Sequence, residues 1–328
     1  MLTSEDHESP GKDRLQDMNI LIATDGSEDA NNALNFMMRF PFPRDSKMTV
    51  LTVVTDIPML PAELDVLDEG QSEALNLANK RLVEEAEELV AREAERLRED
   101  GWSGEAMVRN GNPVKEILRV AGEIDADLIV LGSHGTGMAK RFLLGSVSDR
   151  VMEYANCSVL IVRKKPGEEV TADIEHGANI SYRIMLAYDN SDVAHEALEQ
   201  CSSLQLEDNS AIKVVSIMPL ITAYRQDVSQ HINTIWLQKK QIMQAELEKA
   251  VGSFQWATPN VTTQIREAKS VSDEILTAAE EDGSDLIMFG CKDKSAIKSF
   301  LLGSITHRLG RYAECTVWAV RKKNSDKL

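Results

Sequence analysis

The chain contains two copies of one sequence pattern, and this repeat constrains its fold more than any other feature. The stretch NILIATDGSEDANNAL at 19–34 returns as RIMLAYDNSDVAHEAL at 183–198. A longer stretch at 127–165, DLIVLGSHGTGMAKRFLLGSVSDRVMEYANCSVLIVRKK, returns at 285–323 as DLIMFGCKDKSAIKSFLLGSITHRLGRYAECTVWAVRKK. Because both pairs keep their order and nearly their spacing, the sequence predicts duplication of a whole domain.

The length and the repeat together predict two domains joined by a linker. A chain of 328 residues corresponds to about two domains of ordinary size, each able to bury a core without disulfides or metals. We predict these domains at 18–165 and 182–323. The intervening segment 166–181 is charged, with Pro and Gly near one end, which is typical of a linker. We expect the polar segment 1–17 to form a disordered N-terminal tail and 324–328 to form a second tail.

Short apolar runs alternate with helical patterns within each copy. In the first copy, strand-like runs lie at 19–23, 48–54, 105–109, 127–131 and 158–162. Helical patterns lie between them, at about 29–39 and 75–97, after Pro113 and from Ser146. Alternation of this kind requires right-handed crossovers and yields a parallel sheet with helices on both faces. The predicted fold class is therefore α/β, with two similar five-stranded parallel-sheet sandwiches of Rossmann-like type.

The composition argues against several classes of protein. A net charge of -17 opposes non-specific binding to nucleic acid or anionic lipid, because both need basic surface. The four cysteines are far apart and form no CxxC pair, so neither a disulfide framework nor a zinc site is predicted. No signal peptide and no apolar run near the ~20 residues of a membrane span is evident. We expect a cytoplasmic protein without membrane insertion.

A glycine-rich loop follows the predicted strand at 127–131. Its sequence GSHGTG places Gly132 and Gly135 at the carboxyl end of that strand, where ligands of open α/β sheets bind. Glycine permits positive φ and has no Cβ, so these residues could turn backbone N–H groups inward to form a concave anion site. Gly145 and Ser146 then open a helix, whose first N–H groups and positive dipole end favour phosphate. The loop predicts a site for a phosphate chain.

A tight strand-to-helix turn is the alternative explanation of these glycines. The spacing G-x2-G-x9-G-S matches neither the P-loop GxxxxGK[ST] nor the dinucleotide fingerprint GxGxxG. The Ser146 hydroxyl likewise has two roles open to it, since it can donate to a ligand or cap the helix. The residues alone leave both explanations open.

The sequence resembles a tandem universal stress protein, with two domains of that family covering everything except tails and linker. The resemblance rests on the first strand ending in ATDGS, on GNP before the third helix, and on GSHG followed by nine residues and GS. In nucleotide-binding members, the carboxylate after the first strand meets the nucleoside, a residue of the second strand lines the adenine, and the glycine loop holds ribose and phosphates. The resemblance therefore implies ATP as ligand, with Mg²⁺ held mainly by phosphate oxygens.

The resemblance also implies the residues of the site. The predicted nucleotide-contacting residues are Ala23, Thr24, Asp25, Val53, Gly132, Ser133, His134, Gly135, Gly145, Ser146 and Val147. No metal-ligating residue is predicted.

Several of these side chains have an alternative role. Asp25 can accept from ribose hydroxyls or cap the helix that follows it. Val53 is expected in a core whether or not adenine lies nearby. His134 can donate to phosphate, face solvent or act as a general acid or base. Lys140 and Arg141 can close over the phosphates or remain solvated charges.

The second copy differs at the glycine loop. Asp293 stands where the first copy has Gly135, and it brings a Cβ and a negative charge to the place of the phosphates. Lys292 and Lys294 can offset part of that charge, and Tyr188 replaces Thr24 and is expected to fill ligand space. We expect this degenerate site to bind adenine nucleotide weakly or not at all, with a different small ligand left open.

The predicted function is that of a stress-response protein that binds ATP in its first domain and acts as a nucleotide-dependent sensor or regulator through an unidentified partner protein. A slow ATP hydrolase or nucleotidyl transferase is the alternative, and a nucleotide-free scaffold is a further one. No catalytic residue is predicted, since neither a P-loop lysine nor a nucleophile paired with a base is evident. The resemblance implies that the terminal strands pair the two domains into an internal pseudo-dimer, and we expect two chains to form a homodimer.

Overall fold

The computed structural model describes residues 17–55, 69–135, 144–164, 180–220, 226–253, 256, 258–291 and 304–322. Several predictions fall outside the described residues: those on both tails apart from Asp17, most of the linker 166–181, Lys140, Arg141, Lys292, Asp293 and Lys294.

Each half of the chain alternates strands and helices, as the apolar runs predict. The first half comprises β1 (Asn19–Ala23), α1 (Glu28–Arg39), β2 (Lys47–Val54), α3 (Glu69–Glu99), β3 (Ser103–Asn110), α4 (Pro113–Glu123), β4 (Leu128–Gly132), α5 (Ser146–Tyr154) and β5 (Ser158–Val162). The second half comprises β6 (Arg183–Ala187), α6 (Asp192–Ser202), β7 (Ala211–Pro219), α7 (Gln226–Gly252), β8 (Val261–Ala268), α8 (Val271–Asp282), β9 (Leu286–Gly290), α9 (Ser304–Tyr312) and β10 (Thr316–Val320).

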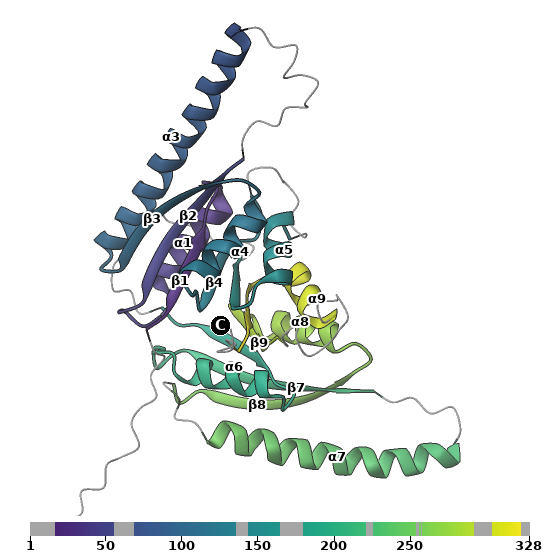
Figure 1. Cartoon of the computed structure of the whole chain (residues 1–328). Helices are drawn as coiled ribbons and strands as arrows, with labels where there is room; N and C mark the ends of the chain where they lie inside the picture. The colour runs from purple at the N-terminus through teal and green to yellow at the C-terminus, as the bar shows by residue number, and fades with distance from the viewer. Residues whose placement is uncertain are drawn as a thin grey trace, which may run out of the picture.

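The strands form one ten-stranded sheet in the order β3-β2-β1-β4-β5-β10-β9-β6-β7-β8 (Figure 1). Within each half all five strands are parallel, as predicted. The two halves meet where β5 and β10 pair antiparallel, with Leu160 opposite Trp318. The five-stranded sheets are therefore joined edge to edge, so the expected pairing of the terminal strands is confirmed.

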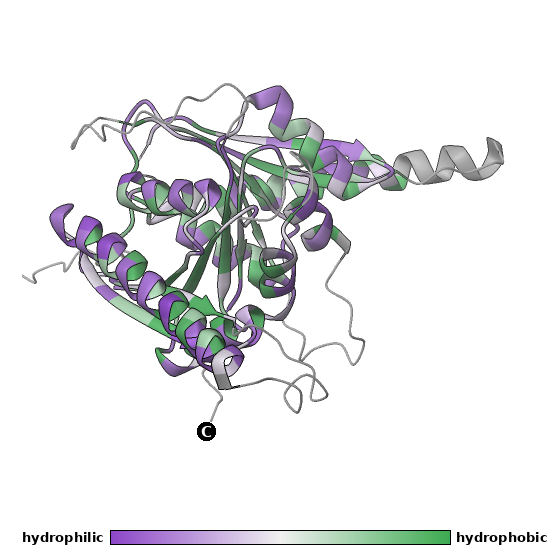
Figure 2. Ribbon diagram, turned by 90° about the horizontal axis from the view of Figure 1, so that it is seen from above, coloured by the Kyte–Doolittle hydropathy of each residue, from purple (hydrophilic) through white to green (hydrophobic). Residues whose placement is uncertain are grey.

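Side chains alternate between two apolar layers, one on each face of this sheet. In β1, Ile20 and Ile22 belong to a cluster with residues of α1, α3, α6 and α7. Leu21 and Ala23 belong to a second cluster with residues of α4, α5, α8 and α9. Because both clusters run through both halves, helices cover the two faces along the whole sheet, and Figure 2 shows the apolar central strands between them.

Short polar side chains define the starts of several helices. Ser27 accepts a hydrogen bond from the amide of Ala30 at the start of α1, and Asn112 does the same for Lys115 in α4, where Pro113 is the first helical residue. Ser191 and Ser270 cap α6 and α8 in the second half. The GNP and DGSED segments therefore start helices because each contains a side chain that caps the helix N-terminus.

The four cysteines are buried and free. Burial raises the pKa of Cys201 to about 12, so this thiol remains protonated near neutral pH. Among the described residues, no helix combines the length and the apolar character that crossing a membrane requires.

Candidate functional site

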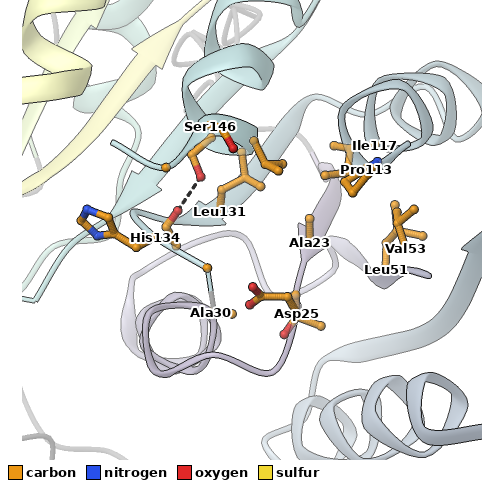
Figure 3. Close-up of a pocket in the computed structure, with 16 residues that line it drawn as sticks. Ala23, Asp25, Ala30, Leu51, Val53, Pro113, Ile117, Leu131, His134 and Ser146 are labelled. Carbon is orange, nitrogen blue, oxygen red and sulfur yellow. Dashed lines mark hydrogen bonds between the residues drawn. The ribbon is translucent and has the colours of Figure 1, made fainter. Parts of the chain in front are cut away.

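A cavity of about 410 Å³ lies at the carboxyl ends of β1, β2 and β4. β1 lies between β2 and β4, so the chain order reverses beside it, and this is where open α/β sheets bind ligands. The residues that line the cavity are Ala23, Thr24, Asp25, Ala30, Leu51, Val53, Pro113, Ile117, Leu131, Gly132, His134, Gly135, Gly145, Ser146, Val147 and Ser148 (Figure 3).

All of the residues predicted to contact a nucleotide line this cavity except Ser133. The Ser133 side chain is buried, and its hydroxyl donates to Oδ2 of Asp29 at 2.6 Å. The hydroxyl oxygen of Ser133 therefore binds Asp29 and does not line the cavity.

One wall of the cavity is apolar and was only partly predicted. Val53 lies there, half-buried, beside Leu51, Ile117 and Leu131, which also belong to the cluster on the α4 and α5 face. Sequence reasoning missed Ala30, Leu51, Pro113, Ile117, Leu131 and Ser148 as lining residues. The signal for Pro113 was available, since the GNP segment carried part of the resemblance. An apolar wall of aliphatic side chains suits an aromatic ring.

The opposite wall is the start of α5. Its N-cap is Gly145, which has no side chain to accept from the first turn. By contrast, α1, α4, α6 and α8 each begin with a Ser or Asn that caps them. Ser146 is the first helical residue, so of its two open roles capping is excluded. The first N–H groups of a helix have no intrahelical acceptor, and α5 presents them at the cavity.

The loop glycines are required for close approach. Neither Gly132 nor Gly135 is among the glycines with positive φ, so the prediction that they form a concave site through that conformation is wrong. A Cβ on Gly132 would lie 2.6 Å from the carbonyl carbon of Asp29, because strand β4 packs directly on the first turn of α1. A Cβ on Gly135 would lie 2.5 Å from Oδ2 of Asp25. Only a residue without a side chain leaves this part of the cavity open.

Asp25 lies at the cavity and also stabilises the turn before α1, whose N-cap is Ser27 and not Asp25. Its Oδ1 accepts from the amide of Ser27 at 3.1 Å, which stabilises the turn before α1. Gly26, in the left-handed region with φ +75°, makes that turn. Oδ2 of the same carboxylate lies next to Gly135, where an added Cβ would be 2.5 Å away, and Figure 3 shows Asp25 at the cavity. Asp25 is therefore the carboxylate at the cavity, and it also braces the helix start.

Asp29 organises the glycine loop, and sequence reasoning did not identify it. Its Oδ2 accepts from the hydroxyl of Ser133 at 2.6 Å and from the amide of His134 at 2.9 Å, and lies 3.0 Å from Nδ1 of His134. The hydroxyl of Ser27 also donates to the carbonyl of His134 at 3.4 Å. These contacts fasten the loop to the first turn of α1. The pattern gave no signal because the partners are about a hundred residues apart.

The ring of His134 is held by this contact. It is only 14% exposed, and in Figure 3 it points away from the apolar wall at Val53 and Ile117. A general acid or base must reach the proton that it transfers. The contact with Asp29 therefore gives the His134 ring a role in holding the loop.

The second half repeats the packing at the glycine but replaces the side chains that hold the first loop. A Cβ on Gly290 would lie 2.4 Å from the carbonyl carbon of Val193, as at Gly132. Val193 stands at the repeat position of Asp29, and Cys291 stands at that of Ser133, so the carboxylate and the hydroxyl are both replaced. Val193 and Cys291 therefore cannot reproduce the hydrogen bonds that Asp29 makes with the first loop.

Tyr188 does not fill the space equivalent to the cavity. Its ring lies in the cluster on the α6 and α7 face, whereas Val215 and Ile275, the repeat equivalents of Leu51 and Ile117, lie on the other face. The hydroxyl of Tyr188 bonds to Oδ1 of Asn190 at 2.9 Å and lies 3.0 Å from Nε2 of His195. The prediction that this side chain blocks a ligand is therefore wrong.

Comparison with known proteins gives the same family for both halves. The model of the universal stress protein family matches residues 18–163 and 182–321. Universal stress protein YxiE of Bacillus subtilis (strain 168) is 29% identical over 144 residues, which is 44% of this chain and 97% of the relative. Universal stress protein MJ0531 of Methanocaldococcus jannaschii is 36% identical over 156 residues, which is 46% of this chain and 84% of the relative.

A solved structure matches nearly the whole chain. The crystal structure of a universal stress protein from Archaeoglobus fulgidus DSM 4304 has a TM-score of 0.59 and 20% identity, and the match covers 92% of this chain and 98% of that one. At this identity the likeness concerns the fold. It includes both halves in one chain.

Proposed function

The chain belongs to the universal stress protein family, and from this premise we propose that its first domain, 18–165, binds one molecule of ATP with Mg²⁺. The second domain, 182–323, carries a degenerate site. In this proposal, nucleotide occupancy regulates the binding of a partner protein in the cytoplasm, and two chains associate as a homodimer.

The observation that carries the proposal is the uncapped start of α5 at the cavity. Backbone N–H groups and the positive end of the helix dipole attract phosphate, and a capping side chain would compete for the same groups. Gly132 and Gly135 line the cavity together with this helix start, and a Cβ at Gly135 would lie 2.5 Å from Oδ2 of Asp25. A polyphosphate chain is the ligand group that suits this wall.

The remaining parts of the cavity suit the base and the sugar. The adenine ring would lie against the apolar wall at Val53 and Ile117, where aliphatic side chains exclude water from its faces. Asp25 is the single carboxylate among the described lining residues, and it would accept from the ribose hydroxyls. The described residues contain no cluster of three or more metal-ligating side chains, so Mg²⁺ would be held mainly by phosphate oxygens.

A binding role is better supported than turnover. Hydrolysis needs a residue that positions or deprotonates the attacking water, and Nδ1 of His134 is already engaged by Asp29 at 3.0 Å. A scaffold that binds no nucleotide has no need of an open cavity at the strand ends. The cavity and the uncapped helix therefore favour nucleotide binding over a nucleotide-free scaffold.

The proposal is tested by measuring what the purified protein holds. Protein is denatured and the released small molecules are separated by chromatography, while calorimetry of nucleotide-free protein with MgATP gives the stoichiometry. We expect adenine nucleotide at up to one equivalent and one site per chain. ADP that accumulates with time would indicate hydrolysis. Protein that is empty and does not bind MgATP would contradict the proposal.

Asp29→Ala is expected to weaken ATP binding by about 10-fold, because the loop loses a charged acceptor of hydrogen bonds worth about 1.5–3 kcal/mol each. Glu28→Ala is the matched control: it removes the neighbouring carboxylate, which is 77% exposed and faces away to Lys164. Affinity is measured by calorimetry and stability by thermal unfolding. If Asp29→Ala lowers the unfolding midpoint but leaves the affinity for ATP unchanged, Asp29 stabilises the fold and does not position the loop for binding.

A further inference from the structure

The two halves meet around a pseudo-two-fold axis between β5 and β10. Each half contributes an arginine that crosses this axis. The guanidinium of Arg163 donates to the carbonyl of Gly310 in α9 at 2.6 Å, and that of Arg321 donates to the carbonyl of Met152 in α5 at 2.5 Å. Since Arg163 and Arg321 occupy the same position of the repeat, the backbone framework of this contact is symmetric.

The side chains at the same contact are not symmetric in size. Met152 of α5 and Gly310 of α9 occupy equivalent repeat positions, and they contact one another where the two helices pack. A Cβ on Gly310 would lie 2.3 Å from Sδ of Met152, so the methionine fills the space that the glycine leaves. At the axis, the Met152 side chain of the first half is the knob, and the space at Gly310 of the second half is the hole.

The charges are complementary as well. Asp149 of α5 lies 3.1 Å from Nη2 of Arg311 and 3.7 Å from Nε2 of His307, both in α9. In the repeat, Asp149 is equivalent to His307, and Glu153 is equivalent to Arg311. One helix therefore brings acidic groups to the axis where the other brings basic groups.

The paired strands differ in the same way. Trp318 of β10 lies opposite Leu160 of β5, its repeat equivalent, and it is fully buried. Its ring extends into the first half, with centroids 6.1 Å from Phe40 and 5.5 Å from Phe42. A leucine from a second copy of β5 would leave part of this space empty.

We propose that the asymmetric pairing surface, which we define as Asp149, Met152 and Leu160 on one side and His307, Gly310, Arg311 and Trp318 on the other, selects the other half of the chain and rejects a copy of itself. Pairing of α5 with a second α5 would oppose two methionines and bring together four carboxylates, from two copies of Asp149 and Glu153. Pairing of α9 with a second α9 would oppose two glycines and bring together cationic side chains. Pairing of one half with the same half of a second chain is therefore disfavoured by the sizes and the charges of the facing side chains.

The test exchanges knob and hole in the full chain. Gly310→Met alone should overfill the contact and lower the midpoint of thermal unfolding by about 3–10 °C. It should also expose β5 and β10, so that light scattering after gel filtration shows larger species at higher concentration. The double variant Met152→Gly with Gly310→Met restores one knob and one hole and should recover at least half of the lost midpoint. Recovery of neither property, or a Gly310→Met protein indistinguishable from the parent, would overturn the proposal.

A charge exchange keeps the test decisive if Gly310→Met does not fold. Asp149 and Arg311 are both partly exposed, so Asp149→Arg and Arg311→Asp leave the apolar contact intact. Each single variant should increase association between chains at low salt, and the double variant should return the mass distribution to that of the parent. Lys80→Glu, on an exposed ion pair far from the axis in α3, is the control and should change nothing. Single variants without effect, or a double variant as associated as the singles, would contradict selection by charge.

Discussion

Gly135→Asp is expected to lower the affinity for MgATP by at least about 100-fold, or ~3 kcal/mol. The new Cβ would lie 2.5 Å from Oδ2 of Asp25 and so displace a carboxylate from its position at the cavity. The new carboxylate would also face the polyphosphate chain at close range in a partly buried site. The variant places in the first half the residue that the second half has at this position. Calorimetry with nucleotide-free protein measures the loss.

Gly122→Asp is the matched control for that variant. Gly122 lies in α4 with no atom within 4 Å of an added Cβ, so the same charge is introduced without a clash and away from the cavity mouth. Its affinity should equal that of the parent, and both variants should retain their unfolding midpoints to within a few degrees. Unchanged binding by Gly135→Asp would show that phosphates do not lie beside this loop.

Gly132→Ala is expected to destabilise the protein by about 2–4 kcal/mol, an effect typical of overpacking a core that cannot shift. The added Cβ would lie 2.6 Å from backbone atoms of Asp29, and strand β4 and helix α1 would have to separate. Because Gly290 packs on Val193 in the same way, Gly290→Ala should have a similar effect in the second half. Denaturant unfolding measures both.

Gly122→Ala serves as the control for these two variants, since it adds the same methyl group in open space within a helix. It should leave stability unchanged or raise it by up to about 1 kcal/mol through helix propensity. If Gly132→Ala kept full stability but lost ATP binding, Gly132 would be a ligand residue, and the packing role assigned to it would be wrong.

The sequence predicts the elements well because the two apolar layers impose a strict pattern. Ile20 and Leu21 point to opposite faces, and the run from Ser158 to Val162 is buried throughout, so each reads as a strand within a covered parallel sheet. The periodic residues from Leu75 to Leu97 predict a helix, and α3 extends beyond them at both ends. Most of those end residues are polar, and they carry no apolar period.

The site is predictable only as far as local motifs reach. The GSHG and GS segments identify the loop and the start of α5, but the apolar wall is built by Leu51 and Ile117 from other elements, which read as ordinary core residues. The role of Asp29 depends on tertiary contacts with Ser133 and His134, and the sequence of α1 does not predict these contacts. The sequence suggested two reasons for the loop glycines, positive φ and the missing Cβ, and the structure supports only the missing Cβ.

The central claim is that the N–H groups at the start of α5 hold the phosphates of a nucleotide bound in the first domain. Amide NMR of the full chain during titration with MgATP tests it directly. The account predicts that Ser146, Val147 and Gly135 show the largest shifts, that the shifts saturate at one equivalent, and that Gly290 in the second half is unaffected. Saturating binding that leaves Ser146 and Val147 unshifted, or that shifts only residues of the second half, would contradict it.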